Sequence, residues 1–417
     1  MRVLLSTIGT RGEVQPLVAL AVRLRELGQD VRLCAPPDFR EWAEGLGISF
    51  APMGPELRST AKPDSAMTKA MATPEGRRRM AEAMVVNQFE TLSSAVEDCD
   101  AVVAGMALNI AAHSVAERKG IPYFFTAYCP ITLPSLHHRP PVFAGWAPKN
   151  PGAAIPALWA DDAERWNEQW GEVLDGQRET LGLPPVEDVR GHIFTEQPWL
   201  AADPVLAPWR EPSALDVHQT GAWLLPDHSP LSPELEAFLE DGEPPVYFGF
   251  GSIRAPEEIA KAMIEAARAH GRRAIVYRGW TELALIDDEP DCLAIGDVNQ
   301  QALFPRVAAV VHHGGAGTTT AATRAGVPQV LVPQMFDQPY FAERVRDLGI
   351  GTSLGGEPSA EALTLALGEV LRPDVAARAR RVGGEVRVDG TDVAAKLLME
   401  SVQWSQHPER RAGRGEG

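Results

Sequence analysis

The chain has 417 residues, of which 45% are hydrophobic and 23% charged, a composition typical of a globular protein. This length favours two or more domains of ordinary size. The formal net charge of −17 argues against nucleic acid as a partner, because phosphate binding needs a basic face.

Several features predict a soluble cytoplasmic protein. The four cysteines are far apart in the sequence and lack the spacing of metal ligands, so we expect free thiols. The apolar N-terminus is interrupted by Gly9–Gln15, and no small-residue cleavage site follows it. No apolar run reaches transmembrane length.

The first part of the chain alternates short apolar strands with helices. We expect strands at 2–6, 31–34, 48–52, 101–103 and 122–126. We expect helices at 14–27, 38–46, 67–97 and 109–118, the third with breaks near Pro74 and Gly76. This alternation predicts a parallel sheet that is covered on both faces.

The regularity fails between Pro130 and Pro151, a segment rich in proline and aromatic residues. Long irregular loops inside compact domains are usually functional, so we assign this segment a role in binding. A helix at 160–181 follows, and its Trp166 and Trp170 are interpreted as core residues.

A second strand–helix series follows a proline-rich connection at 204–233. We expect its strands at 246–249, 274–277, 292–295, 309–312 and 329–332. We expect its helices at 256–270, 299–304, 318–325, 338–348, 361–371 and 375–382. The predicted organisation is a first domain at 1–203, the connection at 204–233, a second domain at 234–388, a helix at 389–406 returning to the first domain, and a frayed tail at 407–417. The fold class is therefore α/β, with two facing, Rossmann-like, doubly wound domains and a cleft between them.

The most informative stretch is Ala308–Pro339, which reads as strand, glycine-rich turn, helix, strand and polar loop. A glycine turn that leads into a helix N-terminus favours phosphate, because free N–H groups and the helix dipole attract negative charge. His313 adds a donor, and we expect the hydroxyls of Thr318–Thr320 to satisfy backbone N–H groups at the helix start. Asp337 and Gln338 follow the next strand, at the edge where open α/β sheets bind ligands. The alternative interpretation is a tight turn that serves only packing.

Three further segments are weaker candidates. The first strand leads into Gly9-Thr10-Arg11-Gly12-Glu13, which lacks the full GxGxxG pattern of dinucleotide sites but places a carboxylate at a helix start. Glu13 either acts chemically or complements the helix dipole. The loop Gly249–Ile253 also allows close backbone approach. Asp297–Leu303 begins a short helix, with Asp297 or Asn299 as its cap.

Several motifs resemble those of a known family. HHGGAGT, GVPQVLVP and DQP resemble the nucleotide-sugar signature of two-domain, inverting natural-product glycosyltransferases of the GT-B fold, and GTRGEVQPLVALAVRLRELG resembles their acceptor-side loop. LGLPPVEDV, LAADPVLAP, QTGAWLL, RGWTEL and QPYFAERV resemble the bacterial enzymes that glycosylate vancomycin-type heptapeptide aglycones. The resemblance covers nearly the whole chain.

This resemblance implies transfer of a hexose-type sugar from a UDP- or dTDP-sugar to a hydroxyl of a natural-product acceptor, most closely a glycopeptide aglycone in antibiotic biosynthesis. The first domain would bind the acceptor and the second the donor, with no cofactor or metal. The donor-binding residues that it implies are Thr10, Ser252, Val298, His313, Gly315, Gly317, Thr318, Asp337 and Gln338. Of these, Val298 would bind the nucleobase through its backbone, and Asp337 and Gln338 would bind sugar hydroxyls.

The implied general base is Glu13, where the family usually has Asp. The additional methylene moves the carboxylate by about one carbon–carbon bond, and misplacement on this scale costs about 10²-fold in rate. Three other interpretations stay open: a glycosyltransferase for a macrolide or aromatic polyketide, a nucleotide-sugar epimerase of the same architecture, and a non-catalytic homologue.

Overall fold

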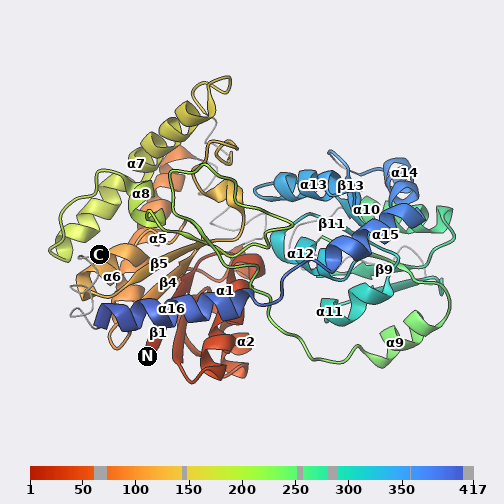
Figure 1. Ribbon diagram of the computed structural model, residues 1–417, viewed down its shortest axis with the longest axis horizontal. Helices are drawn as coiled ribbons and strands as arrows, with labels where there is room; N and C mark the ends of the chain where they lie inside the picture. The colour runs from red at the N-terminus through yellow and green to blue at the C-terminus, as the bar shows by residue number, and fades with distance from the viewer. Residues whose placement is uncertain (61–72, 143–147, 251–256, 280–288, 357, 407–417) are drawn as a thin grey trace, which may run out of the picture. The chain divides into compact units, whose positions relative to one another are not determined.

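The computed structural model describes residues 1–60, 73–142, 148–250, 257–279, 289–356 and 358–406 (Figure 1). Two compact units are present. Unit 1 contains Met1–Ala202, Trp209–Leu225 and the chain from Val388 onward, and unit 2 contains Asp203–Pro208 and Pro226–Arg387. The chain therefore passes between the units more than once, and the middle of the segment 204–233 lies in unit 1.

The sheet of unit 1 consists of parallel strands in the order β3-β2-β1-β4-β5-β6-β7. The strands are β1 (Arg2–Thr7), β2 (Asp30–Ala35), β3 (Ser49–Pro52), β4 (Ala101–Gly105), β5 (Tyr123–Ala127), β6 (Trp199–Leu200) and β7 (His218–Gln219). Successive residues of β1 are buried on both faces of the sheet, which explains its uninterrupted apolar run.

Helices cover both faces of this sheet. They are α1 (Arg11–Glu26), α2 (Arg40–Gly45), α3 (Leu57–Thr60), α5 (Pro74–Ala95), α6 (Ala112–Lys119), α7 (Ile155–Thr180), α8 (Val189–Phe194) and α16 (Gly390–Gln406), with 3₁₀ turns η1 (Pro37–Phe39) and η2 (Pro130–Thr132). Helix α5 runs without a break through Gly76, so the break predicted there is wrong, whereas extended backbone at Thr73 agrees with the break predicted near Pro74. Pro74 starts the helix, and Thr73 caps it by accepting the Gly76 N–H. The part of the predicted helix at 67–72 lies outside the described residues.

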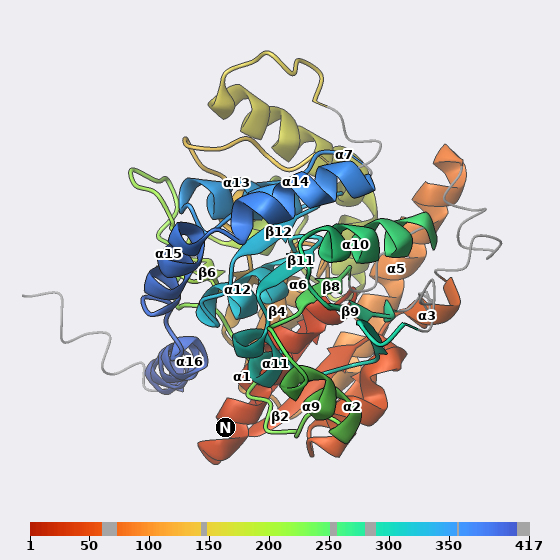
Figure 2. The same ribbon diagram turned by 90° about the vertical axis from the view of Figure 1, so that its right-hand side faces the viewer.

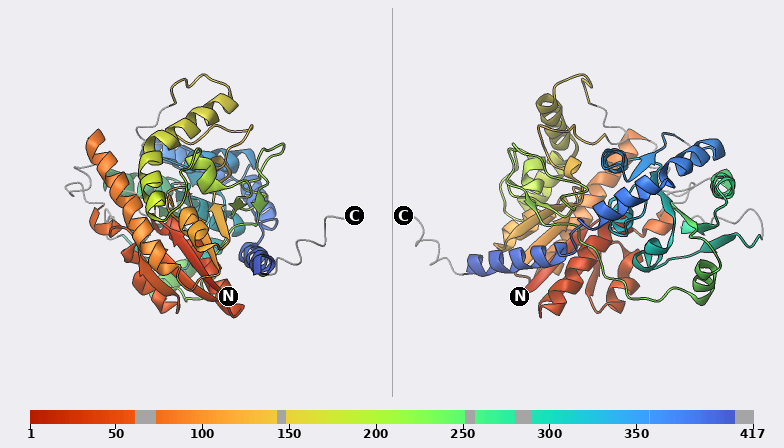
Figure 3. Two further views of the ribbon diagram at one scale, coloured as in Figure 1. Left: turned by 90° about the vertical axis from the view of Figure 1, so that its left-hand side faces the viewer. Right: turned by 45° about the vertical axis from the view of Figure 1, so that its right-hand side comes forward.

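The last helix, α16, packs along the first helix, α1, as the two ends of the colour scale show (Figures 1 and 3). Ala394, Leu398 and Val402 join the core that α1 forms with β1. An ion pair between Arg23 and Asp392, at 2.5 Å, links the two helices at their exposed side. Both ends of the described chain are therefore part of unit 1.

The sheet of unit 2 is also parallel, in the order β10-β9-β8-β11-β12-β13. The strands are β8 (Val246–Gly249), β9 (Ala274–Tyr277), β10 (Cys292–Ile295), β11 (Ala309–His312), β12 (Gln329–Leu331) and β13 (Gly351–Ser353). In each unit the first strand lies beside the fourth strand, β1 beside β4 and β8 beside β11. The strand order of each sheet therefore reverses at that pair.

Two apolar layers sandwich the second sheet. The helices are α9 (Pro233–Glu240), α10 (Glu257–Ala269), α11 (Gln300–Leu303), α12 (Ala316–Arg324), α13 (Gln338–Asp347), α14 (Ala360–Val370) and α15 (Pro373–Gly383), with a 3₁₀ turn η4 (Phe304–Arg306). Phe248 and Val311 face α10 and α14, which lie side by side (Figure 2). Tyr247 and Val310 face the opposite layer, which contains α9 and α12.

These observations confirm the predicted α/β class with two Rossmann-like, doubly wound units. In such sheets ligands bind beyond the carboxyl ends of the strands, where the strand order reverses. In unit 1 this point lies between β1 and β4, and in unit 2 it lies between β8 and β11. The Gly9–Glu13 and His313–Thr318 segments follow β1 and β11 respectively, so each begins at its unit's reversal point.

Candidate active site

The turn after β11 is shaped by glycine. Gly314 has a positive φ of +92°, and a Cβ there would lie 3.1 Å from Leu331 Cδ2 and 3.3 Å from the Gln338 carbonyl. Only glycine fits both the backbone conformation and the space. This close approach brings the β11–α12 turn against the β12–α13 loop, as predicted from their positions at the same edge.

Helix α12 starts at Ala316, two residues before the predicted start. Gly315 occupies the cap position, and among the described residues no side chain caps the helix and no acid lies in its first turn. The prediction that threonine hydroxyls satisfy N–H groups here is wrong, because Thr319 and Thr320 donate to the carbonyls of Gly315 and Ala316. An earlier helix start places these hydroxyls one turn inside the helix. The helix N-terminus therefore keeps its attraction for an anion.

Two adjacent histidines have different roles at this turn. His312 is fully buried; its Nδ1 accepts the Gly314 N–H at 3.1 Å, and its Nε2 lies 3.0 Å from Gln329 Oε1. Burial lowers the pKa of His312 to about 3, so the ring is neutral and holds the turn.

His313 folds over the start of α12. A Cβ on Gly315 would lie 2.6 Å from His313 Nε2, so glycine at this position makes room for the ring. His313 Nδ1 is buried and lacks a well-formed hydrogen bond among the described residues. Burial lowers the pKa of His313 to about 4, and the backbone of Gly249 opposes this effect. An anion bound at the turn would favour the protonated ring and raise its pKa again.

The β12–α13 loop is held by Gln338. This side chain is buried, and its Oε1 accepts the N–H groups of Gln334 at 2.7 Å and Met335 at 3.1 Å. The carbonyl end of the amide is thus used inside the protein. Asp337 stands at the cap position of α13, but its side chain does not cap that helix.

The remaining predicted donor residues lie on other loops of unit 2. Val298 follows β10 and packs at the margin of an apolar core cluster. Asn299 next to it caps α11 and also donates to the Asp227 and Ser229 carbonyls, so Asn299 is the cap predicted as one of two candidates. Ser252 lies outside the described residues.

In unit 1 the carboxylate of Glu13 folds back into the turn that follows β1. The Thr10 hydroxyl donates to Glu13 Oε2 at 2.9 Å, and contact of Thr10 with the donor stays a prediction. Gly9 has a φ of +133°, and a Cβ there would lie 2.9 Å from the Glu13 carboxylate. Glycine therefore allows the acid to fold back over the start of α1.

Burial raises the pKa of Glu13, and hydrogen bonds from the Thr10 hydroxyl and from the backbone of Glu13 and Thr10 oppose this effect. A raised pKa makes a carboxylate a better proton acceptor. The backbone of Glu13 is fixed by Tyr128, whose hydroxyl donates to the Glu13 carbonyl at 3.1 Å. A Cβ on Gly105 would lie within contact distance of the Tyr128 hydroxyl, so glycine at the end of β4 admits that ring.

Two family models match the chain: the N-terminal domain of glycosyltransferase family 28 over residues 3–137, and the C-terminal domain of erythromycin biosynthesis protein CIII-like over residues 280–391. Three enzymes of Amycolatopsis orientalis align with 96% of this chain and 98% of their own length. They are glycosyltransferase GtfE at 51% identity, vancomycin aglycone glucosyltransferase at 50%, and dTDP-epi-vancosaminyltransferase at 44%. The chain belongs to this glycosyltransferase family.

Solved structures agree with the fold of this glycosyltransferase. The glycotransferase of kitacinnamycin superimposes with a TM-score of 0.70 at 19% identity, covering 96% of this chain and 99% of that one. The glycosyltransferase VinC, solved in complex with DTDP, gives a TM-score of 0.66 at 19% identity, covering 98% and 100%. The family resemblance inferred from the motifs and the GT-B fold class are thus confirmed.

The irregular segment after Pro130 of this glycosyltransferase is anchored at several points. Between η2 and α7 its described residues form no helix or strand, as predicted. His138 accepts on its carbonyl the Trp159 indole N–H at 2.9 Å, and its ring lies edge-on to those of Trp159 and Trp209. Arg139 donates to the Pro151 carbonyl at 2.8 Å. Trp166 and Trp170 of the following helix are buried, which confirms their assignment to the core.

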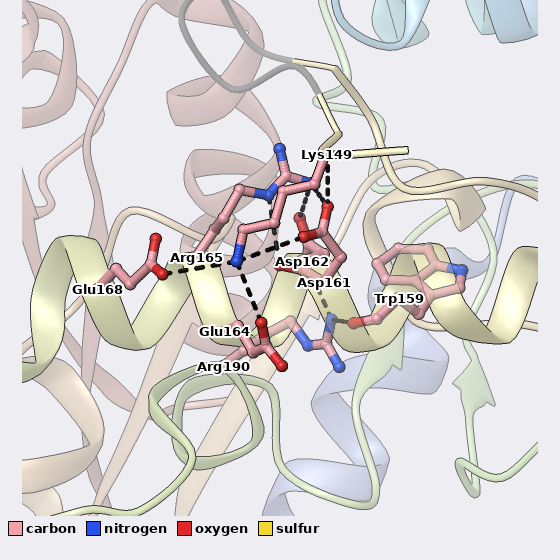
Figure 4. Close-up of polar contacts among 8 residues, drawn as sticks. All are labelled: Lys149, Trp159, Asp161, Asp162, Glu164, Arg165, Glu168 and Arg190. Atoms are coloured by element: carbon pink, nitrogen blue, oxygen red, sulfur yellow. Dashed lines mark hydrogen bonds and ion pairs between the residues drawn. The ribbon is translucent and has the colours of Figure 1, made fainter. Parts of the chain in front are cut away.

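A network of charges holds the end of this segment on α7 (Figure 4). Lys149 Nζ lies 3.2 Å from Glu164, 3.7 Å from Glu168 and 3.8 Å from Asp161. Beneath it, Arg190 of α8 pairs with the buried Asp162 at 2.9 Å and donates to the Trp159 carbonyl. The exposed Lys149 pairs are individually weak, whereas the Arg190 pair is largely buried and tightly hydrogen-bonded.

Sequence reasoning missed several residues of the two turns, chiefly His312, Gly105 and Tyr128. Gly105 could have been found, since it lies just after a predicted strand. Tyr128 carried no such signal, because its contact with Glu13 joins residues 115 apart in the chain. Within the described ranges, no group of three or more His, Cys, Asp or Glu side chains is arranged to hold a metal, and no helix is long and apolar enough to cross a bilayer.

Proposed function

We propose that this glycosyltransferase moves a hexose-type sugar from a UDP- or dTDP-sugar to a hydroxyl of a vancomycin-type glycopeptide aglycone, with inversion at the anomeric carbon and without a metal. The reaction belongs to antibiotic biosynthesis and takes place in the cytoplasm, in keeping with the four free, buried cysteines. The aglycone assignment is supported by 50% identity to the vancomycin aglycone glucosyltransferase over nearly the whole chain.

The observation that carries the donor assignment is the uncapped start of α12. The first-turn N–H groups, with Gly315, Gly317 and Thr318 around them, bind the diphosphate, and the helix dipole favours its charge. His313 covers the same point with an imidazole whose Nδ1 lacks a well-formed hydrogen bond among the described residues. The solved relative VinC is a complex with DTDP, which is consistent with such a ligand.

Other residues of unit 2 complete the donor site in this proposal. Asp337 and the NH₂ group of Gln338 bind sugar hydroxyls, one strand away from the diphosphate. Val298 binds the nucleobase through its backbone, and Ser252 contributes to the diphosphate contacts. Thr10 contributes to the diphosphate contacts in this proposal, and its hydroxyl also donates to Glu13.

Glu13 serves as the general base. It removes the proton from an acceptor hydroxyl as that oxygen attacks the anomeric carbon, and the bond from this carbon to the diphosphate oxygen breaks with its electron pair on the diphosphate. A single displacement gives inversion. Base assistance contributes about 10²–10⁴-fold in rate. Stabilisation of the departing diphosphate by α12 and His313 supplies the larger electrostatic contribution, and this makes a metal unnecessary.

The segment from Pro130 to Trp159 forms the acceptor wall. Its aromatic side chains suit a rigid aromatic aglycone. Anchoring by His138, Trp159 and the Lys149 network fixes this wall on α7, so that the acceptor meets a shaped surface rather than a solvated linker.

A donor and acceptor panel tests the proposal. The purified chain is incubated with UDP- and dTDP-sugars and a vancomycin-type aglycone, and products are measured by mass spectrometry. We expect the aglycone to gain one sugar mass, an equal amount of nucleoside diphosphate to be released, NMR to show an inverted anomeric centre, and chelator to leave the rate unchanged.

Three outcomes would contradict it. Transfer only to a macrolide or aromatic polyketide would replace the acceptor class. Deuterium uptake into the sugar from heavy water without acceptor would indicate an epimerase. Donor binding with no transfer to any acceptor would indicate a non-catalytic homologue.

A further inference from the structure

Phe336 is an unusual residue in the loop that precedes α13. Its backbone lies in the left-handed region, with a φ of +53°. This conformation is sterically unfavourable for an aromatic residue but not for glycine. The side chain nevertheless exposes 54% of its surface, so burial in the core does not offset the strain. Such residues are held in place by their surroundings and cluster at functional sites.

The surroundings that fix this conformation are visible. The buried Gln338 carboxamide binds the N–H groups of Gln334 and Met335, and the Gln338 N–H returns to the Met335 carbonyl at 3.2 Å. Phe336 therefore forms the tip of a turn that is closed by the side chain and the backbone N–H of Gln338. The turn presents Phe336 and the 46%-exposed Met335 outward.

This tip lies next to the diphosphate turn. A Cβ added at Gly314 would meet the carbonyl and Cβ of Gln338, so the two loops lie close together at the carboxyl edge of β11 and β12. A diphosphate bound at the start of α12 would therefore lie beside the loop that contains Phe336 and Asp337. A pyranose has polar hydroxyl edges and an apolar face of C–H groups. An acid beside an exposed aromatic ring matches both parts of such a ring.

We propose that Phe336 is a specificity-determining residue, whose ring packs against the C–H face of the donor sugar while Asp337 binds its hydroxyls. The inference rests on the proposed function and identifies the residue that distinguishes a nucleotide sugar from the bare nucleoside diphosphate. The strained backbone sets the direction of the ring, because the same side chain on a relaxed turn would point elsewhere.

Calorimetry on Phe336→Ala tests the inference with two probes, UDP-glucose and UDP, and again with dTDP-glucose and dTDP. Loss of an aromatic contact should weaken binding of the nucleotide sugars about three- to tenfold and leave binding of the bare diphosphates unchanged. Phe336→Tyr keeps the ring and should keep the affinity. Leu365→Ala, which removes a 70%-exposed apolar side chain on α14, serves as the matched control.

A second variant separates contact from folding. Phe336→Gly relieves the backbone strain, so it should melt at a higher temperature than Phe336→Ala while losing the same preference for the nucleotide sugar. An unchanged ratio of sugar-nucleotide to diphosphate affinity in both variants would overturn this inference alone. Failure of the unaltered chain to bind either nucleotide would overturn the proposed function, and this inference with it.

Discussion

Helices α1 and α12 both begin at the point where the strand order of their sheet reverses, but they differ in the charge of their first turn. The first turn of α1 contains a carboxylate, and that of α12 contains none. Each helix has glycine as its second residue, Gly12 or Gly317. The third residue is Glu13 in α1 and Thr318 in α12. The first helix thus carries an anion of its own, folded over Gly9 and held by Thr10.

This difference shows that a glycine-containing helix start can hold either a carboxylate of the protein or an anion of a ligand. A helix start supplied with an internal carboxylate is neutralised and presents a proton acceptor. A helix start without an acid keeps its attraction for an external anion. The third residue of each helix decides which of the two is held, and substitutions there test the comparison directly.

The largest effect is expected from Glu13→Gln. Glutamine keeps the hydrogen-bonding shape of the helix start but does not accept a proton, so turnover should fall about 10²–10⁴-fold. Binding of UDP or dTDP should not change. Single-turnover rates with the best donor and aglycone provide the measurement.

Glu13→Asp is the matched control, since it retains a carboxylate with one methylene fewer. Its turnover should stay well above that of Glu13→Gln. Full activity in Glu13→Gln would remove this residue from the chemistry and leave it only a role in capping α1.

Thr318→Glu makes α12 resemble α1. The new carboxylate at the third position should stabilise the helix start by about 0.3–1 kcal/mol and raise the melting temperature. It should also repel the diphosphate and weaken UDP or dTDP binding at least about tenfold. Thr318→Gln, which has the same size without the charge, separates repulsion from crowding. Equal nucleotide affinity in Thr318→Glu and the unaltered chain would show that the anion binds elsewhere.

The smallest effect is expected from Thr10→Val. The Thr10 hydroxyl lowers the pKa of Glu13 against the larger raising effect of burial. Its loss should raise this pKa further, and because the base acts only when ionised, the acid limb of kcat/KM should move to higher pH. Rates well above that limb should change little. A limb that stays in place, measured across pH 5–9, would mean that another group controls it.

The same pKa has a consequence for stability. Since burial raises the pKa of Glu13 in the folded chain, its contribution is fully present below the unfolded pKa and is lost as pH rises through the folded pKa. Thermal melts of Thr10→Val over this range should show the loss at a higher pH than in the unaltered chain.

Much of the fold could be predicted because the longer buried strands are continuous apolar runs and the helices show regular apolar spacing. The short strands β6 and β7 were missed, since two residues among prolines leave no periodic pattern. The strand β13, Gly351–Ser353, was missed because it lacks apolar residues.

The candidate site was predictable only where local sequence determines it. Gly314, Gly315 and Asp337 are neighbours of strand ends, so their positions could be inferred. The hydroxyls of Thr319 and Thr320 depend on where α12 starts, which is set by the backbone at Gly315 rather than by the residues themselves. The placement of Tyr128 depends on the order of β1, β4 and β5, which only the assembled sheet defines.

The packing of α16 on α1 makes unit 2 an insertion within unit 1. Gly390 approaches the backbone of Gly221 and Ala222 so closely that a Cβ would overlap it, which seats the returning chain firmly. A fragment that stops after Arg387 would leave the apolar side of α1 uncovered and prone to aggregation. Unit 1 should therefore be produced alone only from a gene in which a short linker replaces residues 226–387.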